Sequence, residues 1–184
     1  FFINIKELPQ ITDKIIKFCN HLLGHIRGGL SYVNISASML FAGISGTAIS
    51  DTASLGAVMI PAMKKEGYDS DFSCAITAAS STVGPIIPPS LPMIIAATLS
   101  GLSVGKLFLA GAIPGLLLGL GLMLVAYFVA KKKNYPKHQK SSILQILKSF
   151  TNTFWALLMT LIILFGIVGG VFTPTEASVV AVLY

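Results

Sequence analysis

Residues 43–56 read GISGTAISDTASLG, and this segment decides how the chain around it can fold. It lies between the apolar stretches SASMLFA and AVMIPAM, which favour burial in an apolar environment. Glycine, serine, threonine and aspartate nevertheless make up most of the segment itself. Because polar groups without partners are costly away from water, their presence here needs a physical reason.

The composition of the chain is typical of a membrane protein. Of its 184 residues, 54% are hydrophobic and only 11% are charged, whereas a soluble domain carries roughly 25% charged residues. The mean hydropathy is +0.81. Residues 107–130 and 155–172 contain no charged side chain, and each run can cross a hydrocarbon core of about 30 Å as a helix. We therefore expect an all-α polytopic membrane protein embedded in a lipid bilayer.

The net charge of +6 does not indicate a nucleic-acid partner, because the cations are placed at the edges of apolar runs. Lys64 and Lys65 follow one such run, and KKKNYPKHQK at residues 131–140 follows another. Membrane proteins carry this excess of lysine in the loops that stay in the cytoplasm. The pattern predicts a basic cytoplasmic loop over residues 131–142.

The polar segment divides residues 28–63 into two arms. As one helix these residues would measure ~54 Å, which is too long for a bilayer, and two full spans need about 40 apolar residues. Two arms of about 17 and 12 residues, ~25 and ~18 Å, predict a re-entrant hairpin. Its tip must be buried in protein or face a water-filled cavity. Before it, residues 1–27 carry apolar residues at helical spacing interrupted by lysines, which predicts an interfacial amphipathic helix.

Residues 72–100 form a second interrupted segment. Its centre reads SSTVGPIIPPSLP, and proline removes a backbone donor and clashes with the preceding turn, so no regular helix passes through. The half-helix before the prolines then ends with carbonyls that lack helical partners. This pattern predicts a proline-broken transmembrane helix.

Two apolar stretches complete the pattern. Residues 107–130 predict a helix in which glycines spaced by four allow close contact with a neighbour. Residues 143–184 predict further transmembrane helices, the last one opened by TPTEA with Thr173 as N-cap and Glu176 in its first turn. The chain begins without methionine and ends inside an apolar run, so we expect an internal, truncated piece of a longer protein.

One chemical interpretation of residues 43–46, GISG, is an intramembrane serine protease, because rhomboid-type proteases have similar surroundings for their nucleophile. A nucleophilic serine needs a base within hydrogen-bond reach. The histidines, His21, His25 and His138, all lie in interfacial or loop stretches. A protease would therefore require a base from outside this segment.

The other interpretation is that the two interruptions bind an ion or a substrate. Hard cations such as sodium take oxygen ligands, which unwound backbone, hydroxyl groups and the negative ends of half-helix dipoles supply. Secondary transporters bind their cargo where discontinuous helices meet near the middle of the bilayer. A non-transporting scaffold stays open as an alternative, since serine and threonine also bond within membrane helices.

Asp51 carries the strongest functional signal, because a carboxylate inside a membrane is costly and is functional by default. It has two possible roles. It can cap the returning arm of the hairpin, where helical N–H groups favour an anion, or it can bind cargo directly. The sequence leaves both roles open.

Three motifs in order, GISGTAISDTASLGAVMIPAMKKEGYD, AASSTVGPIIPPSLPM and GGVFTPTEA, resemble the large membrane subunit of tripartite ATP-independent periplasmic (TRAP) transporters. The resemblance covers about residues 24–184. It implies an elevator-type transporter half, with residues 28–130 as half of the transport domain, in a multi-pass protein of the bacterial inner membrane. It also implies sodium-coupled import of an organic acid of the C4-dicarboxylate or sialic-acid type, and no enzyme activity.

The resemblance further implies partners and site residues. A periplasmic solute-binding protein delivers the substrate, a small membrane subunit braces the transporter, and sodium is the coupling ion, without any other cofactor. The expected sodium ligands are Ser45, Gly46, Thr47, Thr52, Ser81, Gly84 and Pro89. The expected substrate-binding or tip-capping residues are Ser50, Asp51, Ser80 and Thr82. Where the family usually has Ser-Gly-Ser, this chain has Ser45-Gly46-Thr47, which keeps a hydroxyl group.

Overall fold

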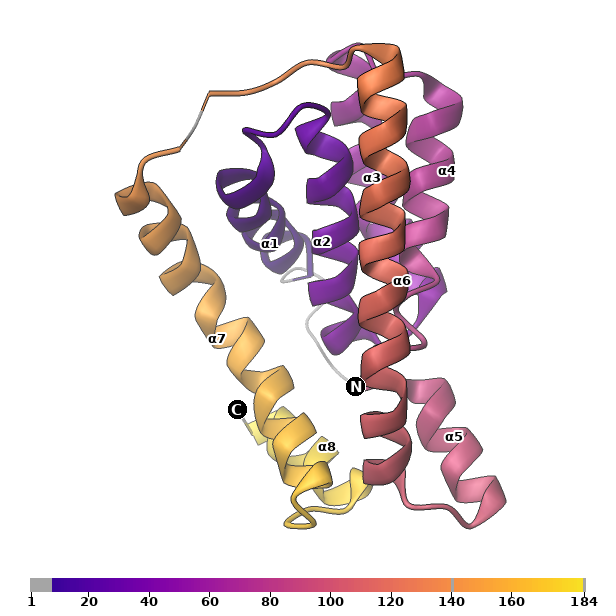
Figure 1. Ribbon diagram of the computed structural model, residues 1–184. Coiled ribbons are helices and arrows are strands. Elements are labelled where there is room, and N and C mark those ends of the chain that lie inside the picture. Colours follow the sequence, from indigo (N-terminus) through magenta and orange to yellow (C-terminus); the bar gives the residue numbers. More distant parts are fainter. Residues whose placement is uncertain (1–7, 140, 184) are drawn as a thin grey trace.

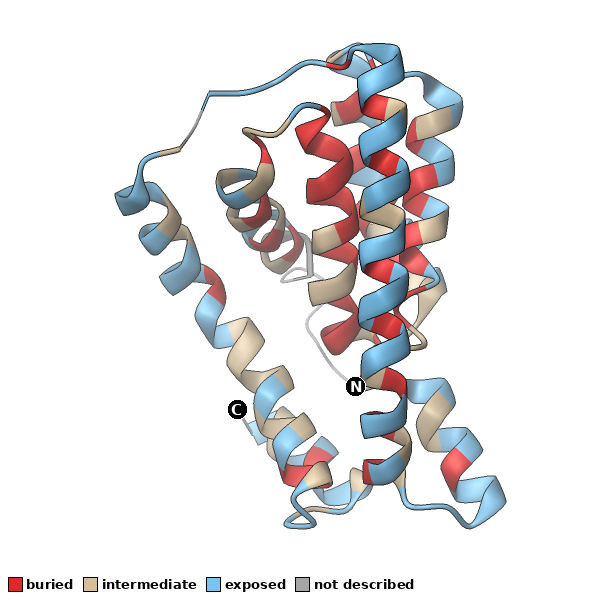
Figure 2. Cartoon of the chain, viewed as in Figure 1, coloured by how far each residue is buried: buried red, intermediate tan, exposed pale blue. Residues whose placement is uncertain are grey.

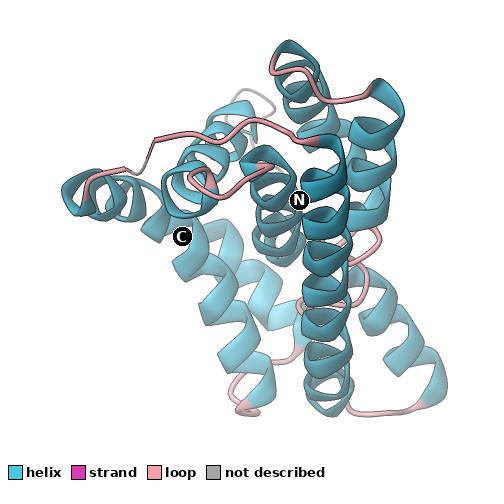
Figure 3. Cartoon of the chain, turned by 45° about the horizontal axis from the view of Figure 1, so that its top comes forward, coloured by secondary structure: helices cyan, strands magenta, loops and turns pink. Residues whose placement is uncertain are grey.

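The computed structural model describes residues 8–139 and 141–183, and all regular structure in these residues is helical (Figures 1 and 3). The prediction of an all-α protein is therefore confirmed for this part of the chain. Residues 1–7 of the expected interfacial helix, Lys140 of the basic loop and Tyr184 lie outside the described residues. The helices are α1 (Leu8–Leu23), α2 (Gly29–Ser45), α3 (Ala48–Lys65), α4 (Ser70–Ser81), α5 (Leu91–Ser100), α6 (Val104–Lys133), α7 (Ile143–Val168) and α8 (Pro174–Leu183).

Two helices in the described residues are long and apolar enough to cross a membrane. They are α6, with 30 residues, and α7, with 26 residues, or about 45 and 39 Å at 1.5 Å per residue. Much of the surface of both helices is exposed in this chain (Figure 2). The exposed side chains on α6 are largely leucine, isoleucine, valine and phenylalanine. An apolar exposed surface is what a helix in contact with lipid or with another membrane helix requires.

The polar segment joins α2 to α3 through a turn of two residues, Gly46 and Thr47. Gly46 ends α2 with a φ of 62°, a left-handed conformation that glycine adopts without steric cost. Thr47 is the N-cap of α3, and its side chain accepts a hydrogen bond from the N–H of Ser50 at 3.4 Å. Because of this cap, α3 starts earlier than we expected: it has 18 residues, and α2 has 17.

Residues 82–90 separate α4 from α5. After Ser81 the chain forms a tight turn, in which the N–H of Gly84 donates to the Ser81 carbonyl three residues earlier at 3.1 Å. The prolines that follow cannot donate to a helical ladder. Helix resumes where the Ser90 hydroxyl accepts a hydrogen bond from the N–H of Met93 at 3.4 Å. Local sequence chemistry thus sets both ends of the interruption.

Helix α2 lies at the centre of the fold. It packs against α1, α3, α4, α6 and α7, and it is the most continuously buried helix in Figure 2. Val33, Ile35 and Phe41 of α2 are fully buried and share a core with Leu55 and Met59 of α3. Full burial of one such side chain contributes roughly 1.5–3 kcal/mol. A helix that is apolar on most sides belongs inside a bundle, and α2 occupies that position.

A stripe of glycines brings α6 close to the two interrupted segments. A Cβ atom at Gly111 would lie 2.8 Å from the carbonyl oxygen of Ile86 in the interruption. A Cβ atom at Gly119 would collide with the side chain of Met39 on α2. Gly121 has open space instead. The spacing by four therefore places the missing side chains on the packed face of α6.

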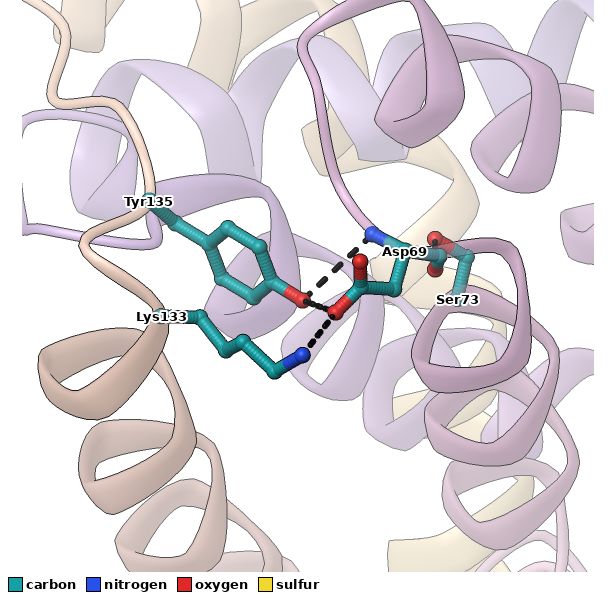
Figure 4. A network of polar contacts seen from close by, with 4 residues as sticks. All are labelled: Asp69, Ser73, Lys133 and Tyr135. Atoms are coloured by element: carbon teal, nitrogen blue, oxygen red, sulfur yellow. Dashed lines mark hydrogen bonds and ion pairs between the residues drawn. The ribbon is translucent and has the colours of Figure 1, made fainter.

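Asp69 anchors the end of α6 to the turn between α3 and α4 (Figure 4). Its carboxylate lies 2.9 Å from the Lys133 ammonium and accepts a hydrogen bond from the Tyr135 hydroxyl at 3.0 Å. The Lys133 contact, followed by the Tyr135 contact, lowers the pKa of the Asp69 carboxyl below its ordinary value, because both stabilise the charged form. The Tyr135 ring also stacks on Tyr68, with centroids 4.2 Å apart. These contacts hold the start of the basic loop.

The start of α8 has the predicted cap. The N–H of Glu176 donates to the Thr173 hydroxyl at 3.3 Å, and the Glu176 carboxylate accepts from the N–H of Thr173 at 2.8 Å. This reciprocal pair is a capping box. The predictions of Thr173 as N-cap and of Glu176 as a residue of the first turn are confirmed.

Candidate functional site

Asp51 is fully buried in the first turn of α3. Its Oδ1 atom accepts a hydrogen bond from the Ser45 hydroxyl at the end of α2. Its Oδ2 atom has no hydrogen-bond partner among the described residues. Thr47, and not Asp51, is the N-cap of α3. A buried carboxylate oxygen without a partner carries a desolvation cost, so this atom calls for an explanation.

Gly84 of the interruption lies directly beside this carboxylate. A Cβ atom at Gly84 would be 2.6 Å from Oδ2 of Asp51 and 3.2 Å from the carbonyl oxygen of Ser81. Only glycine therefore leaves room for the carboxylate at this point of the loop. The α2–α3 turn and the loop after α4 meet here, although 33 positions separate Asp51 from Gly84.

The turn also touches the start of α5. The carbonyl of Gly46 accepts a hydrogen bond from the N–H of Leu91 at 3.4 Å. A Cβ atom at Gly46 would lie 3.2 Å from the carbonyl oxygen of Pro89. Two backbone carbonyls of the second interrupted segment thus approach the first one, that of Pro89 beside Gly46 and that of Ser81 beside Gly84, where Asp51 lies. Carboxylate, hydroxyl and carbonyl oxygens together form the donor set that hard cations prefer.

The structure divides the expected site residues into three groups. Those that meet where the two segments touch are Ser45, Gly46, Asp51, Gly84 and Pro89. Thr47, Ser50 and Ser81 lie near this point and bond within their own cap or helix, and Ser80 bonds both within α4 and to Ser38 of α2. Those with exposed side chains whose hydroxyls donate to a carbonyl of their own helix are Thr52 and Thr82. The first group is the best supported by geometry.

A cavity of about 1160 Å³ opens beside the turn. Ser45, Gly46 and Pro89 form part of its wall, and apolar side chains of α5, α7 and α8 form most of the rest. Asn152 and Lys14 add polar groups at its boundary. A cavity that is mainly apolar with a few polar groups is typical of a small-molecule site.

The packing of α2 on α6 shows where the α2–α3 turn lies along the length of α6. Gly28 lies against Ala130, and Met39 lies against Gly119. The two helices are antiparallel, and equal steps of eleven residues separate these contacts on each helix. Continued seven residues to Gly46, the same register reaches Ala112 of α6, two turns from Gly119 toward the α6 N-terminus and next to Gly111.

The loop after α4 reaches the same level. Gly111 of α6 faces the carbonyl of Ile86 in that loop. Gly111 is two turns from Val104 at the start of α6, or roughly 11 Å along the helix axis. The α2–α3 turn and the interruption therefore lie at one depth, short of the end of α6 that carries α5.

The sequence did not reveal a pair of buried polar contacts between α2 and α4. The amide nitrogen Nδ2 of Asn34 donates to Oγ1 of Thr77 at 2.7 Å. The hydroxyl oxygens of Ser38 and Ser80 are 2.9 Å apart. All four residues are fully buried. The available signal was a single amide in an apolar run, and it does not identify the helix that supplies its partner.

The contacts of Ser45 do not resemble those of a catalytic serine. Its hydroxyl is bonded to Asp51, while His21 contacts Ser141 and His138 contacts Glu66. No group of three or more His, Cys, Asp or Glu side chains suited to a metal ion occurs in the described residues. The Ser45 hydroxyl is thus bonded to a carboxylate and not to a histidine base.

Comparison with known proteins identifies close relatives. The chain is 48% identical over 174 residues to the sialic acid TRAP transporter permease protein SiaT of Haemophilus influenzae (strain 86-028NP), covering 95% of this chain and 28% of that protein. It is 47% identical to the sialic acid TRAP transporter large permease protein SiaM of Vibrio cholerae, covering 95% and 41%. It is 44% identical to the C4-dicarboxylate TRAP transporter large permease protein DctM of Pseudomonas aeruginosa, covering 95% and 41%.

The chain thus spans between 28% and 41% of the length of these relatives. Residues 1–184 match the protein family described as "Tripartite ATP-independent periplasmic transporter, DctM component". The all-helical architecture with two long apolar helices agrees with a membrane permease. The match over the whole chain shows that it belongs to the DctM component family of TRAP transporters, a family of transport permeases and not of enzymes.

Proposed function

We propose that this chain supplies half of the transport domain of a sodium-coupled importer of an organic acid in the bacterial inner membrane. A periplasmic solute-binding protein delivers the acid, and a small membrane subunit supports the permease. The relatives named above are described as sialic acid and C4-dicarboxylate permeases. Both kinds of substrate are carboxylic acids, so an organic anion is the cargo that we assign.

The observation that carries this proposal is the unpartnered Oδ2 atom of Asp51 beside Gly84. A bound sodium ion would provide its missing partner. Ser45, Gly46, Asp51 and Pro89 would contribute the protein oxygens, from both interrupted segments. Sodium binding there would join the two segments, because each supplies part of the donor set.

The depth of the site supports a re-entrant hairpin. The turn at Gly46 lies level with Gly111, about two turns of helix short of Val104. The arms α2 and α3 would then enter and leave the membrane on the side of the basic loop, residues 131–142. Residues 28–130 would move together against the rest of the transporter, as an elevator mechanism requires.

Coupling between sodium and substrate follows from linkage. The turn that would hold sodium also forms part of the wall of the 1160 Å³ cavity. If sodium draws the two segments together, the acid binds better with sodium present, and sodium binds better with the acid by the same factor. An anionic substrate is also better tolerated beside a bound cation.

Uptake by the complete transporter that contains this chain tests the proposal. We would reconstitute it in proteoliposomes with its binding protein and measure uptake of labelled sialic acid and succinate with an inward sodium or choline gradient. We expect accumulation that requires sodium. Asp51→Asn and Ser45→Ala should raise the sodium concentration for half-maximal uptake about tenfold, or 1.4 kcal/mol.

The matched control is Thr98→Val on α5, whose exposed hydroxyl donates to carbonyls of its own helix. It should leave the sodium requirement unchanged. Uptake of both acids by the wild-type transporter at the same rate in choline would overturn sodium coupling. An unchanged sodium requirement in Asp51→Asn would remove Asp51 from the site.

A further inference from the structure

Two buried hydrogen bonds connect α2 to α4, two and three turns of α2 away from Ser45 of the proposed site. Asn34 donates to Thr77 at 2.7 Å, and the hydroxyls of Ser38 and Ser80 lie 2.9 Å apart. No part of these four side chains is exposed. Both contacts cross between the same two helices, at successive turns of each. We call this set the α2–α4 polar pairs.

The polar pairs fix the axial position of α4 on α2 more strictly than apolar contacts can. Hydrogen bonds require donor and acceptor within a narrow range of distance and angle, whereas burial of apolar surface is non-directional. A shift of one residue moves a helix by about 1.5 Å, which is enough to break both bonds. Buried polar contacts are best known for fixing register in this way.

The same two helices carry the two sides of the proposed sodium site. Ser38 and Ser45 are on α2, two turns apart, and Ser80 precedes Gly84 by four residues. The space between Gly84 and Oδ2 of Asp51 is tight, since a Cβ atom would lie only 2.6 Å away. An axial shift of α4 would therefore change how the carboxylate faces the loop.

The hydrogen bonds of Thr77 fix how its hydroxyl accepts from Asn34. Its hydroxyl donates to the carbonyl of Ser73 at 2.7 Å, so its lone pairs are left for the amide of Asn34. The Asn34 amide also lies 3.7 Å from Sδ of Met63 on α3. Asn34 therefore links α2 to both α3 and α4, the helices that lead away from the turn and into the interruption.

From this geometry we propose that Asn34, Ser38, Thr77 and Ser80 are positioning residues for sodium binding. They do not contact the ion, and they set the register in which α2 and α4 present Ser45, Asp51 and Gly84. This inference rests on the proposed function, because it assigns these residues a role in the same site. It predicts that the polar pairs govern sodium affinity more strongly than substrate affinity.

The test uses the complete reconstituted transporter and two readouts. The first is the sodium concentration for half-maximal uptake, compared with the KM for the acid. The second is the shift of the unfolding temperature when sodium chloride replaces choline chloride, since a ligand of the folded state raises that temperature. The variants are Thr77→Val, Asn34→Leu and the double variant, with Thr77→Ser as the conservative replacement.

We expect Thr77→Val and Asn34→Leu each to raise the half-maximal sodium concentration about tenfold and to reduce the sodium-induced temperature shift. The KM for the acid at saturating sodium should stay within about twofold. Thr77→Ser keeps the hydroxyl and should restore the wild-type sodium response. The double variant should be no worse than either single variant, because the residues act as one pair.

The result that overturns the inference is a Thr77→Val transporter with the wild-type sodium midpoint, whatever its unfolding temperature in choline. Such a variant would show that the pairs stabilise the fold without positioning the site. If Thr77→Val does not fold, Ser80→Ala removes a smaller group, and it must raise the sodium midpoint for the inference to stand. A wild-type transporter without any sodium response would instead remove the proposed function, and this inference with it.

Discussion

At the scale of single residues, the contact between Gly84 and Asp51 makes the sharpest prediction. Gly84→Ala places a methyl group 2.6 Å from Oδ2 of Asp51. The same methyl group would lie 3.2 Å from the backbone carbonyl oxygen of Ser81, which cannot move freely, so the carboxylate has to move instead. We expect the carboxylate to be displaced and the half-maximal sodium concentration for uptake to rise at least tenfold, a loss of about 1.4 kcal/mol. Sodium-dependent uptake in proteoliposomes measures this effect.

Gly121→Ala provides the comparison for this substitution. Gly121 lies midway along α6 on its exposed side, and a methyl group added there would meet nothing within 4 Å. Alanine is also favoured over glycine in a helix by roughly 0.8–1.0 kcal/mol. Sodium dependence should remain that of the wild type. Equal sodium midpoints for the alanine variants at positions 84 and 121 would show that the Gly84 contact is irrelevant to the ion.

At the scale of elements, the packed face of α6 predicts a graded series. Gly111→Ala brings a methyl group to 2.8 Å from the backbone carbonyl of Ile86, which cannot yield without moving the loop. Gly119→Ala meets only the flexible side chain of Met39. We therefore expect the unfolding temperature in detergent to fall most for Gly111→Ala, by the effect of about 1–3 kcal/mol typical of overpacking, and less for Gly119→Ala.

Gly121→Ala completes the α6 series and should unfold at or above the wild-type temperature. Differential scanning fluorimetry of the purified variants provides the ranking. A larger fall of the unfolding temperature for Gly119→Ala than for Gly111→Ala would contradict the assignment of the Ile86 carbonyl as the rigid neighbour.

The junction between α6 and the α3–α4 turn makes a prediction about pH. Lys133 and Tyr135 lower the pKa of Asp69 from its ordinary value of 3.8. A lowered pKa in the folded state means that the stabilising contribution is present above pH 3.8 and is lost as the pH falls through the lowered value. The effect at neutral pH is small, because Lys133 and Asp69 are about half exposed.

Asp69→Asn should therefore be slightly less stable than the wild type at pH 7, and the difference should vanish at a pH below the lowered pKa. Unfolding temperatures measured across this range test the sign. Asp71→Asn, in the first turn of α4 and also exposed, controls for the loss of a carboxylate. A difference that grows as the solution becomes more acidic would contradict the assigned contact.

At the scale of the whole molecule, the helices predict the sidedness of three exposed positions. We expect cysteines introduced at Lys65 and Lys137 to react with a membrane-impermeant reagent from the cytoplasmic side. A cysteine at Leu102, between α5 and α6, should react from the opposite side, because α6 is long enough to cross the membrane. The experiment compares inside-out with right-side-out vesicles, after Cys19 and Cys74 are replaced by alanine. Labelling of Leu102→Cys and Lys137→Cys from one side would contradict a spanning α6.

The helical class and many helix ends follow from local chemistry, which is why sequence could predict them. The charge-free run at residues 107–130 lies inside α6, and the Thr173 cap precedes α8. The start of α3 was harder, because Thr47 and Asp51 are both good N-cap types four residues apart. The structure resolves the choice: Asp51 turns toward Ser45, which leaves Thr47 as the cap.

The candidate site was only partly readable in the sequence. Ser45, Asp51 and Gly84 attracted attention because they are polar or small inside apolar runs, and the structure brings them together. The orientation of Thr52 away from them depends on the phase of α3, which is set by its cap. The Asn34–Thr77 pair depends on how α4 lies on α2. Such pairings are decided by tertiary packing, so neither residue alone discloses its partner.

The two-residue turn between α2 and α3 also limits how the site can open. Gly46 is in the left-handed region, and the side chain of Thr47 is bonded to the first turn of α3 as its N-cap. The connection therefore contains almost no free backbone torsions. A floppy loop could fluctuate on the nanosecond timescale, but this turn cannot move without tilting both helical arms. In the proposed transport cycle, release of cargo would therefore require a collective motion of whole helices, which belongs to the microsecond-to-millisecond range. The stiffness of this short connection would make helix motion, and not loop motion, the step that sets the rate of the transport cycle.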